Sequence, residues 1–267
     1  ITNNNGYSNP EVTCTNNQTG SIENNTLTIE RVTNDTICTV EYKANTYQVK
    51  YNSNGGSGNM ENSTHTYGTA KALSTNTFTR DGYTFLGWST EAEATSATYT
   101  DGQSVSNLTS EDGGVVNLYA VWKINTYTVS VVVQNGTITG STNKTVNYNS
   151  NGTFTVNAST GYSSPTVNCT NSQNGSISGT TLTVSNVTNN TICTVTYEPI
   201  TYTITYNLDG GNATNPNSYT IESDTITLNN PSKTGYTFTG WTGSNGSSAQ
   251  TTVTIPKGST GNKSYTA

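Results

Sequence analysis

Four cysteines are the side chains of this 267-residue sequence whose type and spacing together point to a defined chemistry. They form two pairs, Cys14 with Cys38 and Cys169 with Cys193, and the members of each pair are 24 residues apart. Oxidation of a pair to a disulfide would close a loop and, in the chain-entropy model, stabilise a small module by about 3.5 kcal/mol. Such bonds persist in oxidising compartments, so they would place the chain outside the cytoplasm.

Two other interpretations of the cysteines compete with a disulfide. Buried free thiols are one, because unpaired cysteine is often buried. A metal site is the other, but the sequence has no Cys-x-x-Cys motif, and its single histidine, His65, lies in a polar stretch away from both pairs. We expect the two disulfides, and we expect His65 to be a solvated loop residue.

Strand alternation predicts that the cysteines point into a core. In the last cysteine segment, Cys193, Val195 and Tyr197 share one face of an expected strand, and valine and tyrosine identify that face as buried. Cys169 shares its face with Val167 in the same way. The first pair of cysteines shows the same alternation, so we expect each disulfide to form within one folded module.

The segments that carry the cysteines occur twice. The segment around Cys14 returns around Cys169, and TYQVKYNSNGG from Thr46 returns as TYTITYNLDGG from Thr201, both 155 residues later. Two unlike modules, which we call A and B, therefore alternate, and such a period is typical of repeat proteins. The expected organisation is a partial A module at residues 1–44, a B module at 45–124, a complete A module at 125–199 and a B module at 200–267.

Composition argues against several classes of protein. Only 30% of the residues are apolar and 10% are charged, but 17 tyrosines and recurring Val, Ile and Thr favour folded β modules over disorder. The ten Lys and Arg residues are scattered, so nucleic acid is not an expected partner. No apolar run approaches the roughly 18 residues that span a bilayer, so we expect no membrane contact by this segment.

The complete A module contains short strands separated by turn signals. Three Asn-Gly dipeptides begin at positions 135, 151 and 174, and Asn-Gly between alternating runs is the strongest short signal for a hairpin. The segment SISGTTLTV is expected to form a hairpin as well. About seven strands at this spacing predict an immunoglobulin-like β-sandwich.

The B modules carry an ordered series of glycine and aromatic motifs. The first contains GYTFLGWST from Gly82 and LYAVW from Leu118, and the second contains GYTFTGWTGSNG from Gly235 and then IPKGSTGNKSYTA. The first copy resembles the Listeria–Bacteroides repeat, and the second resembles its relative, the internalin B-type repeat. The resemblance implies a β-grasp-like module of strands with a short helix, on secreted or wall-attached bacterial surface proteins, without catalytic residues or cofactor. From the residues themselves, one helical turn is expected at 107–112.

The aromatic residues of the B modules are expected to be structural, because large aromatics supply much of the buried area in a small module. A platform for stacking on sugars is the alternative, which the position of these residues in expected strands disfavours. The expected structural aromatics are Tyr83, Phe85, Trp88, Trp122, Tyr236, Phe238 and Trp241.

Other polar motifs do not predict a site. The turns NSNGG and NLDGG supply at most one carboxylate, which favours tight turns over calcium loops. Glu91, Glu93, Glu111 and Asp112 are expected on solvated loops rather than as a catalytic pair, and no nucleophile elbow, P-loop or dinucleotide motif occurs. We expect no enzyme, no metal and no cofactor.

These observations predict a mainly β structural repeat region of a bacterial extracellular surface protein or fibre, acting as a stalk or spacer that presents an adhesive domain. The alternative is a binding module in which the B repeats contact a host protein or glycan weakly and the array supplies avidity. An exposed aromatic cluster at the same place in both B copies would favour that alternative. The other expected partners are neighbouring copies in a filament or flanking repeats of the same chain.

Alignment of the copies predicts incomplete modules at both ends. Ile1 aligns with Val156, and Ala267 aligns with Ala120, two residues before the counterpart of Trp122. The first module is therefore expected to have an uncovered apolar face, to be covered by upstream sequence or by a neighbouring molecule. Short linkers further predict an elongated array with contacts between neighbouring modules only. They lie at residues 43–45, 123–125 and 198–200.

Overall fold

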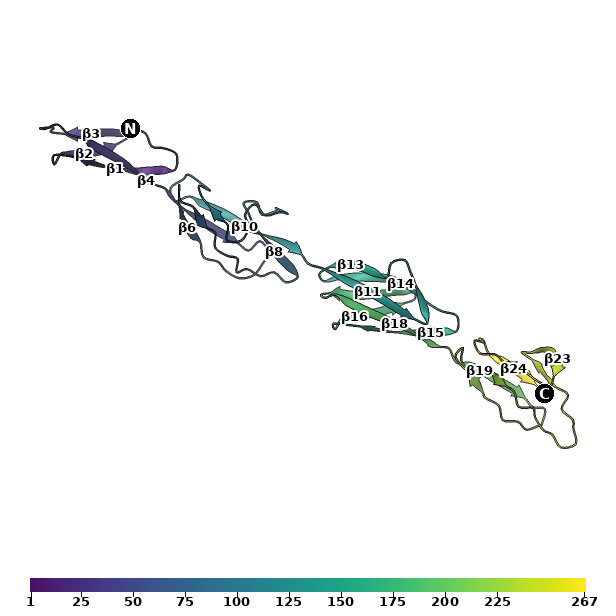
Figure 1. Ribbon diagram of the computed structural model, residues 1–267. Coiled ribbons are helices and arrows are strands. Elements are labelled where there is room, and N and C mark those ends of the chain that lie inside the picture. The colour runs from purple at the N-terminus through teal and green to yellow at the C-terminus, as the bar shows by residue number, and fades with distance from the viewer. The chain divides into compact units, whose positions relative to one another are not determined.

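The computed structural model describes residues 1–267 and consists of strands, turns and irregular segments, without a helix (Figure 1). The chain divides into two compact units, Ile1–Asn125 and Thr126–Ala267. Each unit contains an A module followed by a B module. The fold is therefore mainly β, as the residue pattern predicts. The chain forms no helix with the length and hydrophobicity that a membrane crossing requires.

The helical turn expected at residues 107–112 is wrong. Asn107 adopts a left-handed backbone conformation with a φ of 56°, which a right-handed helical turn does not accommodate. Its side-chain oxygen accepts a hydrogen bond from the backbone N–H of Gly68, and the Asp112 carboxylate accepts one from the backbone N–H of Thr46. The segment therefore forms a loop that is held by side-chain hydrogen bonds, several of them to other parts of the module.

The complete A module, in the second unit, is a two-layer sandwich of eight strands rather than about seven. One sheet has the order β13-β11-β18-β15, and the other has the order β12-β14-β17-β16. Val129, Phe154, Leu182 and Val195 are among the buried side chains between the sheets. The strands are β11 (Thr126–Gln134), β12 (Gly136–Thr139), β13 (Asn143–Asn147), β14 (Ser150–Ala158), β15 (Tyr162–Cys169), β16 (Asn174–Ser178), β17 (Thr181–Val187) and β18 (Thr191–Pro199).

The Asn-Gly dipeptides do not form the hairpins expected of them. β11 ends before Asn135, but β12, which starts at Gly136, belongs to the other sheet, so this dipeptide marks a crossing between the layers. A Cβ at Gly136 would lie 2.5 Å from the carbonyl oxygen of Asn157, so the crossing requires glycine. The dipeptides at 151 and 174 lie within β14 and β16. The segment SISGTTLTV does form a hairpin, in which Gly179 and Thr180 connect β16 to β17.

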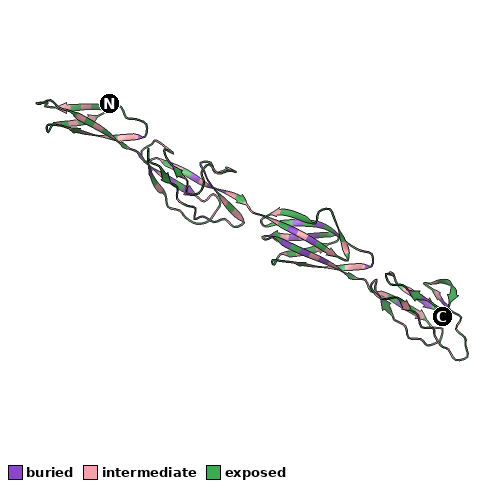
Figure 2. Ribbon diagram, in the orientation of Figure 1, coloured by how far each residue is buried: buried purple, intermediate pink, exposed green.

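The first unit begins with the last four strands of an A module, which pair in the registers of their counterparts β15–β18. Counterparts of β11–β13 and of most of β14 are not among residues 1–44, so the face that is buried in the complete module is open here (Figure 2). Val32 is 59% exposed, whereas its counterpart Val187 is 0% exposed. The strands are β1 (Tyr7–Cys14), β2 (Thr19–Glu23), β3 (Thr26–Glu30) and β4 (Cys38–Ala44).

The first B module has a four-stranded sheet in the order β6-β5-β10-β8. Its first and last strands, β5 and β10, run parallel, whereas β6 and β8 pair antiparallel at the two edges. Leu73 and Phe78, from irregular segments rather than from a helix, join the core around Trp88. The strands are β5 (Thr46–Asn52), β6 (Ser63–Thr66), β7 (Lys71–Ala72), β8 (Tyr83–Ser89), β9 (Ser104–Val105) and β10 (Val115–Ile124).

The second B module repeats this arrangement with one more strand, in the order β20-β19-β25-β22-β23, and β19 and β25 run parallel. Residues 236–240, which correspond to most of β8, are irregular. β25 pairs with β22 but not with these residues, whereas β10 pairs with β8 from Tyr83 to Ser89. The strands are β19 (Tyr202–Asn207), β20 (Ser218–Tyr219), β21 (Ile226–Thr227), β22 (Trp241–Gly243), β23 (Gly246–Gln250), β24 (Thr254–Ile255) and β25 (Lys263–Thr266).

Candidate functional site

Both pairs of cysteines are joined as disulfides within their own modules. Cys169 on β15 and Cys193 on β18 lie directly opposite each other in an antiparallel pair, and Cys14 and Cys38 hold the same positions on β1 and β4. Each bond therefore links two neighbouring strands of one sheet, and no cysteine is free. Cys193 is fully buried together with Val195, on the face that alternation predicts.

A glycine on the opposite sheet makes room for each disulfide, and the residue pattern did not reveal it. A Cβ at Gly175 would lie 2.8 Å from Sγ of Cys169, closer than two such atoms approach. In the first module, a Cβ at Gly20 would lie 3.2 Å from Sγ of Cys14. The available signal was that these glycines recur 155 residues apart, in step with the cysteines they face.

The aromatic residues of the first B module form one connected cluster around Trp88, which is fully buried. Its ring centroid lies 4.9 Å from that of Tyr51 and 5.0 Å from that of Phe85. Phe85 also packs against Trp122, at 5.5 Å, and the Trp122 indole N–H donates to the carbonyl oxygen of Ser53 at 2.8 Å. Edge-to-face and tilted pairs at these distances stabilise a core beyond the area they bury.

The two central tryptophans differ in how their indole N–H groups are satisfied. Trp241 Nε1 donates to Asn230 Oδ1 at 3.1 Å. Trp88 Nε1 is buried without an acceptor. Pairing of the adjacent segments places Thr77 where the second copy has Asn230. The first copy therefore carries a polar group whose burial is uncompensated.

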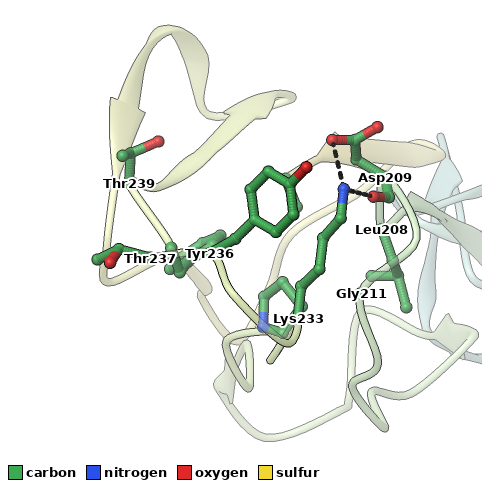
Figure 3. A pocket seen from close by; sticks show the side chains of 10 residues that line it. Leu208, Asp209, Gly211, Lys233, Tyr236, Thr237 and Thr239 are labelled. Carbon is green, nitrogen blue, oxygen red and sulfur yellow. Dashed lines mark hydrogen bonds and ion pairs between the residues drawn. The ribbon is translucent and has the colours of Figure 1, made fainter.

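A surface pocket of about 210 Å³ in the second B module lies where the first copy holds the Trp122 indole (Figure 3). Leu208, Gly211 and Phe238 line it. Their counterparts are the residues that Trp122 contacts in the first copy: Ser53, whose carbonyl accepts its N–H, Gly56, where a Cβ would lie 2.8 Å from the indole, and Phe85.

Tyr236, expected to be structural, is instead 72% exposed at the rim of this pocket. The Lys233 ammonium lies 4.3 Å from its ring centroid and also bonds to the backbone and carboxylate of Asp209 (Figure 3). In the first copy Arg80 covers Tyr83 in the same way at 3.9 Å, and Tyr83 is half-buried because it belongs to β8.

His65 is not the solvated loop residue expected from its polar neighbours. It lies on β6 with only 1% of its surface exposed, its ring stacks on Tyr47, and Nε2 is 3.0 Å from Ser63 Oγ. Nδ1 has no partner. Burial, and secondarily the positive charge of Lys71, lowers the pKa of His65 below its ordinary value of 6.5.

The four acidic side chains that were expected on loops are not arranged as a reactive pair. Glu91, Glu93, Glu111 and Asp112 are exposed, and no group of three or more His, Cys, Asp or Glu side chains is arranged to hold a metal ion. Asp112 is engaged with the backbone at the start of β5.

A junction between the A and B modules occurs in both units with the same backbone bond. The N–H of Asn45 donates to the carbonyl of Gly6 at 2.9 Å, and the N–H of Ile200 donates to the carbonyl of Gly161 at 2.8 Å. Both glycines have a φ above 80° and pack against the following B module, where a Cβ at Gly161 would lie 2.7 Å from Ile221.

The tyrosine after each junction glycine also contacts the B module. Tyr7 meets Tyr67 edge-to-face at 5.9 Å, and the Tyr162 hydroxyl donates to Glu222 Oε1 at 3.0 Å. Burial and the Glu222 carboxylate both raise the pKa of the Tyr162 phenol. The Gly-Tyr pair recurs 155 residues apart, which was the signal by which sequence comparison could have found the junction.

These features define a tandem-repeat protein built from small β modules, in which disulfide-bonded A modules precede aromatic-centred B modules. The family model of the Listeria-Bacteroides repeat domain matches residues 47–121 and 202–266, more than half of the chain, and the chain belongs to this family. The same model matches the second B module, whose motifs had suggested the internalin B-type repeat. No curated protein and no solved structure matches the chain.

Proposed function

We propose that this chain is a load-bearing spacer in a bacterial surface protein, holding an adhesive domain away from the cell. Membership of the Listeria–Bacteroides repeat family supports a place in a bacterial surface protein. The two disulfides support an oxidising location outside the cytoplasm. The proposal assigns no catalytic step to the chain.

The observation that carries the proposal is the pairing of the first and last strands of each module. β5 pairs with β10, β11 with β18, and β19 with β25, and all three pairs are parallel. Parallel strands run in the same direction, so the chain enters each of these modules at one end of the pair and leaves at the other. Each of these modules therefore adds the length of its own strands to the path of the chain.

The same pairing suits a chain under tension. Force on the two ends of the complete A module pulls β11 and β18 in opposite directions along their common axis. The bonded register from Val129 opposite Thr191 to Gln134 opposite Thr196 is then loaded all at once. A single hydrogen bond contributes only about 1 kcal/mol net, so resistance depends on loading the whole set together.

The connections between modules also fit a spacer. Asn45 alone separates β4 from β5, and Ile200 and Thr201 alone separate β18 from β19. The backbone hydrogen bonds of Asn45 and Ile200 to the preceding A module restrict the freedom of these short connections.

Single-molecule pulling of the full chain in two geometries tests the proposal. Attachment before Thr126 and after Pro199 shears β11 against β18, whereas attachment at Thr160 and after Pro199 peels β15 from β18 one bond at a time, starting at the opposed residues Tyr162 and Pro199. We expect a clearly higher unfolding force for the complete A module in the first geometry. Equal forces in both geometries would contradict a load-bearing role.

The alternative of weak binding by the B modules has less support. It requires an exposed aromatic cluster at the same place in both copies. Tyr236 is exposed, but its counterpart Tyr83 is half-buried, with Arg80 stacked on its ring. Of the remaining aromatics, Tyr67 and Tyr119 are half-buried, and the others are core residues or pack directly against the core.

A further inference from the structure

We propose that each A module and the B module after it form one rigid pair, because the exit end of the A module is a docking surface for a turn of that B module. The proposal concerns the joint between the two modules and stands whether or not the chain acts as a spacer. Three observations carry it: a glycine that packs on the same B turn in both pairs, the hydrogen bonds of Asn45, and the recurrence of the joint with different side chains.

The first observation is that a glycine at the exit end of each A module packs on the same turn of the following B module. Gly6 precedes β1 and Gly161 precedes β15, and both have a φ above 80°. A Cβ at Gly6 would overlap the ring of Tyr67. One at Gly161 would lie 2.7 Å from Cδ1 of Ile221. Strand register places Tyr67 and Ile221 at equivalent positions after β6 and β20, so the same two surfaces meet in both pairs.

The second observation is that Asn45, the single residue between β4 and β5, bonds to both modules with all of its polar groups. Its backbone N–H donates to the Gly6 carbonyl at 2.9 Å, and its side-chain oxygen accepts a hydrogen bond from the Ser8 hydroxyl. On the B side, its carbonyl accepts from the Tyr67 N–H at 2.8 Å, and its Nδ2 donates to the Ser110 carbonyl at 2.7 Å. Asn45 is only 7% exposed, so these bonds are shielded from water, which strengthens them.

The third observation is that the joint recurs although its side chains change. In the second unit an isoleucine, Ile200, connects the modules, and its N–H donates to the Gly161 carbonyl at 2.8 Å. Apolar packing on Ile221 and the hydrogen bond from the Tyr162 hydroxyl to Glu222 take the place of the amide bonds of the first joint. The backbone bond and the glycine conformation are common to both joints. Two different sets of side chains therefore maintain the same contact.

A joint of this kind couples the stability of the two modules. In the second pair, the turn of the B module holds Ile221 and Glu222 against the A module, so movement of the A module removes contacts that this turn makes when both modules are folded. Residues in contact show such coupling, and the coupling acts equally in both directions. Each A module therefore stabilises the B module after it, although the two have separate cores.

Residual dipolar couplings of the full chain test the proposal without any variant. In a rigid pair, the backbone N–H couplings of residues 126–199 and 200–266 give alignment tensors of the same magnitude. Clearly different magnitudes would show that the two modules reorient independently and would overturn the proposal. The comparison of pulling geometries reads strand pairing within a single A module, so the spacer function and the rigid pair can fail separately.

Two glycine variants test the coupling. Gly161→Ala pushes a Cβ onto Ile221, whereas Gly140→Ala places one at a similar φ of 88° in the same A module with no atom within 4 Å. Both variants strain the A module, but only the first disturbs the joint. We expect amides of β19 and β20 in the B module to exchange about tenfold faster in Gly161→Ala and at an unchanged rate in Gly140→Ala. Equal rates in the two variants would overturn the proposal.

A milder variant keeps the test valid if Gly161→Ala unfolds the A module. Tyr162→Phe removes only the hydroxyl that donates to Glu222 and leaves the glycine turn unstrained. It should speed exchange in β19 and β20 by a smaller factor, while protection of β11 and β14 shows that the A module remains folded. Unchanged exchange of these B-module strands in Tyr162→Phe as well as in Gly161→Ala would count against any coupling through the joint.

Discussion

The imidazole of His65 stacks on the phenol ring of Tyr47 with 5.5 Å between ring centroids, and in the second B module Tyr219 faces Tyr202 at the same distance. Strand register places His65 and Tyr219 at the same position of the two copies. The Tyr219 hydroxyl donates to the carbonyl of Gly261, whereas His65 leaves Nδ1 without a partner. The first B module therefore buries the titratable imidazole of His65 at the position where the second B module buries the hydrogen-bonded phenol of Tyr219.

The buried histidine predicts that acid destabilises the first B module. The pKa of His65 is lowered in the folded state, so the unfolded chain binds the proton more readily. The associated stability is present above pH 6.5 and is lost as the pH falls through the lowered pKa. We expect His65→Tyr to remove this dependence, because a phenol does not titrate in this pH range. The new hydroxyl should be satisfied, since the Gly114 carbonyl holds the position that the Gly261 carbonyl holds in the second copy. Urea unfolding between pH 4 and pH 8 measures it, and an unchanged pH slope in the variant would contradict the prediction.

The glycine beneath the second disulfide predicts a packing defect on substitution. In Gly175→Ala the new Cβ would lie 2.6 Å from Val167 and 2.8 Å from Sγ of Cys169. Overpacking of this kind costs about 1–3 kcal/mol. Gly152→Ala is the matched control in the same module, because its Cβ would meet Val129 at an ordinary 3.4 Å. Thermal unfolding should show a lower Tm for Gly175→Ala only, and similar values for both variants would refute the prediction.

The unequal indole partners predict opposite effects in the two B modules. Asn230→Ala removes the acceptor of Trp241 Nε1 and should cost about 1–3 kcal/mol of unfolding free energy. Thr77→Asn supplies Trp88 with an equivalent acceptor and should stabilise the first B module by about 0.5–1.5 kcal/mol. Thr77→Ala offers no acceptor and serves as the control. Denaturant unfolding followed by tryptophan fluorescence reports both modules, and a gain in Thr77→Ala equal to that in Thr77→Asn would exclude this explanation.

The open face of the first A module predicts that added strands would cover it. Because Ile1 aligns with Val156, a chain with a second copy of residues 126–155 placed before Ile1 should assemble a complete sandwich there. Burial of Val32 would contribute at most roughly 1.5–3 kcal/mol, and burial of Val40, which is already half-buried, would contribute less.

Hydrogen exchange across β4 should slow in that extended chain. The control carries Val129→Asp and Phe154→Asp in the added copy, which places charges on the face meant to be buried. Unchanged exchange in the extended chain, or equal slowing in the control, would show that the two A modules are not interchangeable in this way.

Local alternation was enough to orient the cysteine strands. Cys193, Val195 and Tyr197 are buried on one face, as their spacing of two residues predicts, because side-chain direction in a strand depends only on the residue's own position. The 155-residue lag likewise predicts two alternating kinds of module, A and B. Both inferences use information that lies within a short stretch of chain or in its repetition.

Partner choice between strands could not be predicted in this way. Asn135 and Gly136 carry a hairpin signal, but they mark a crossing between sheets, since membership of a layer depends on burial against distant residues. His65 is buried because β6 pairs with β5 and turns its ring onto Tyr47, although its sequence neighbours are polar.

The sequence by itself thus determined the period of the chain, the strand faces and the pairing of the cysteines, which follow from local geometry and repetition. Only the tertiary structure decided the strand order, the parallel pairing of first and last strands and the glycines that face the disulfides. Those features arise from contacts between residues far apart in the chain, and their free energy exists only when both partners are in place.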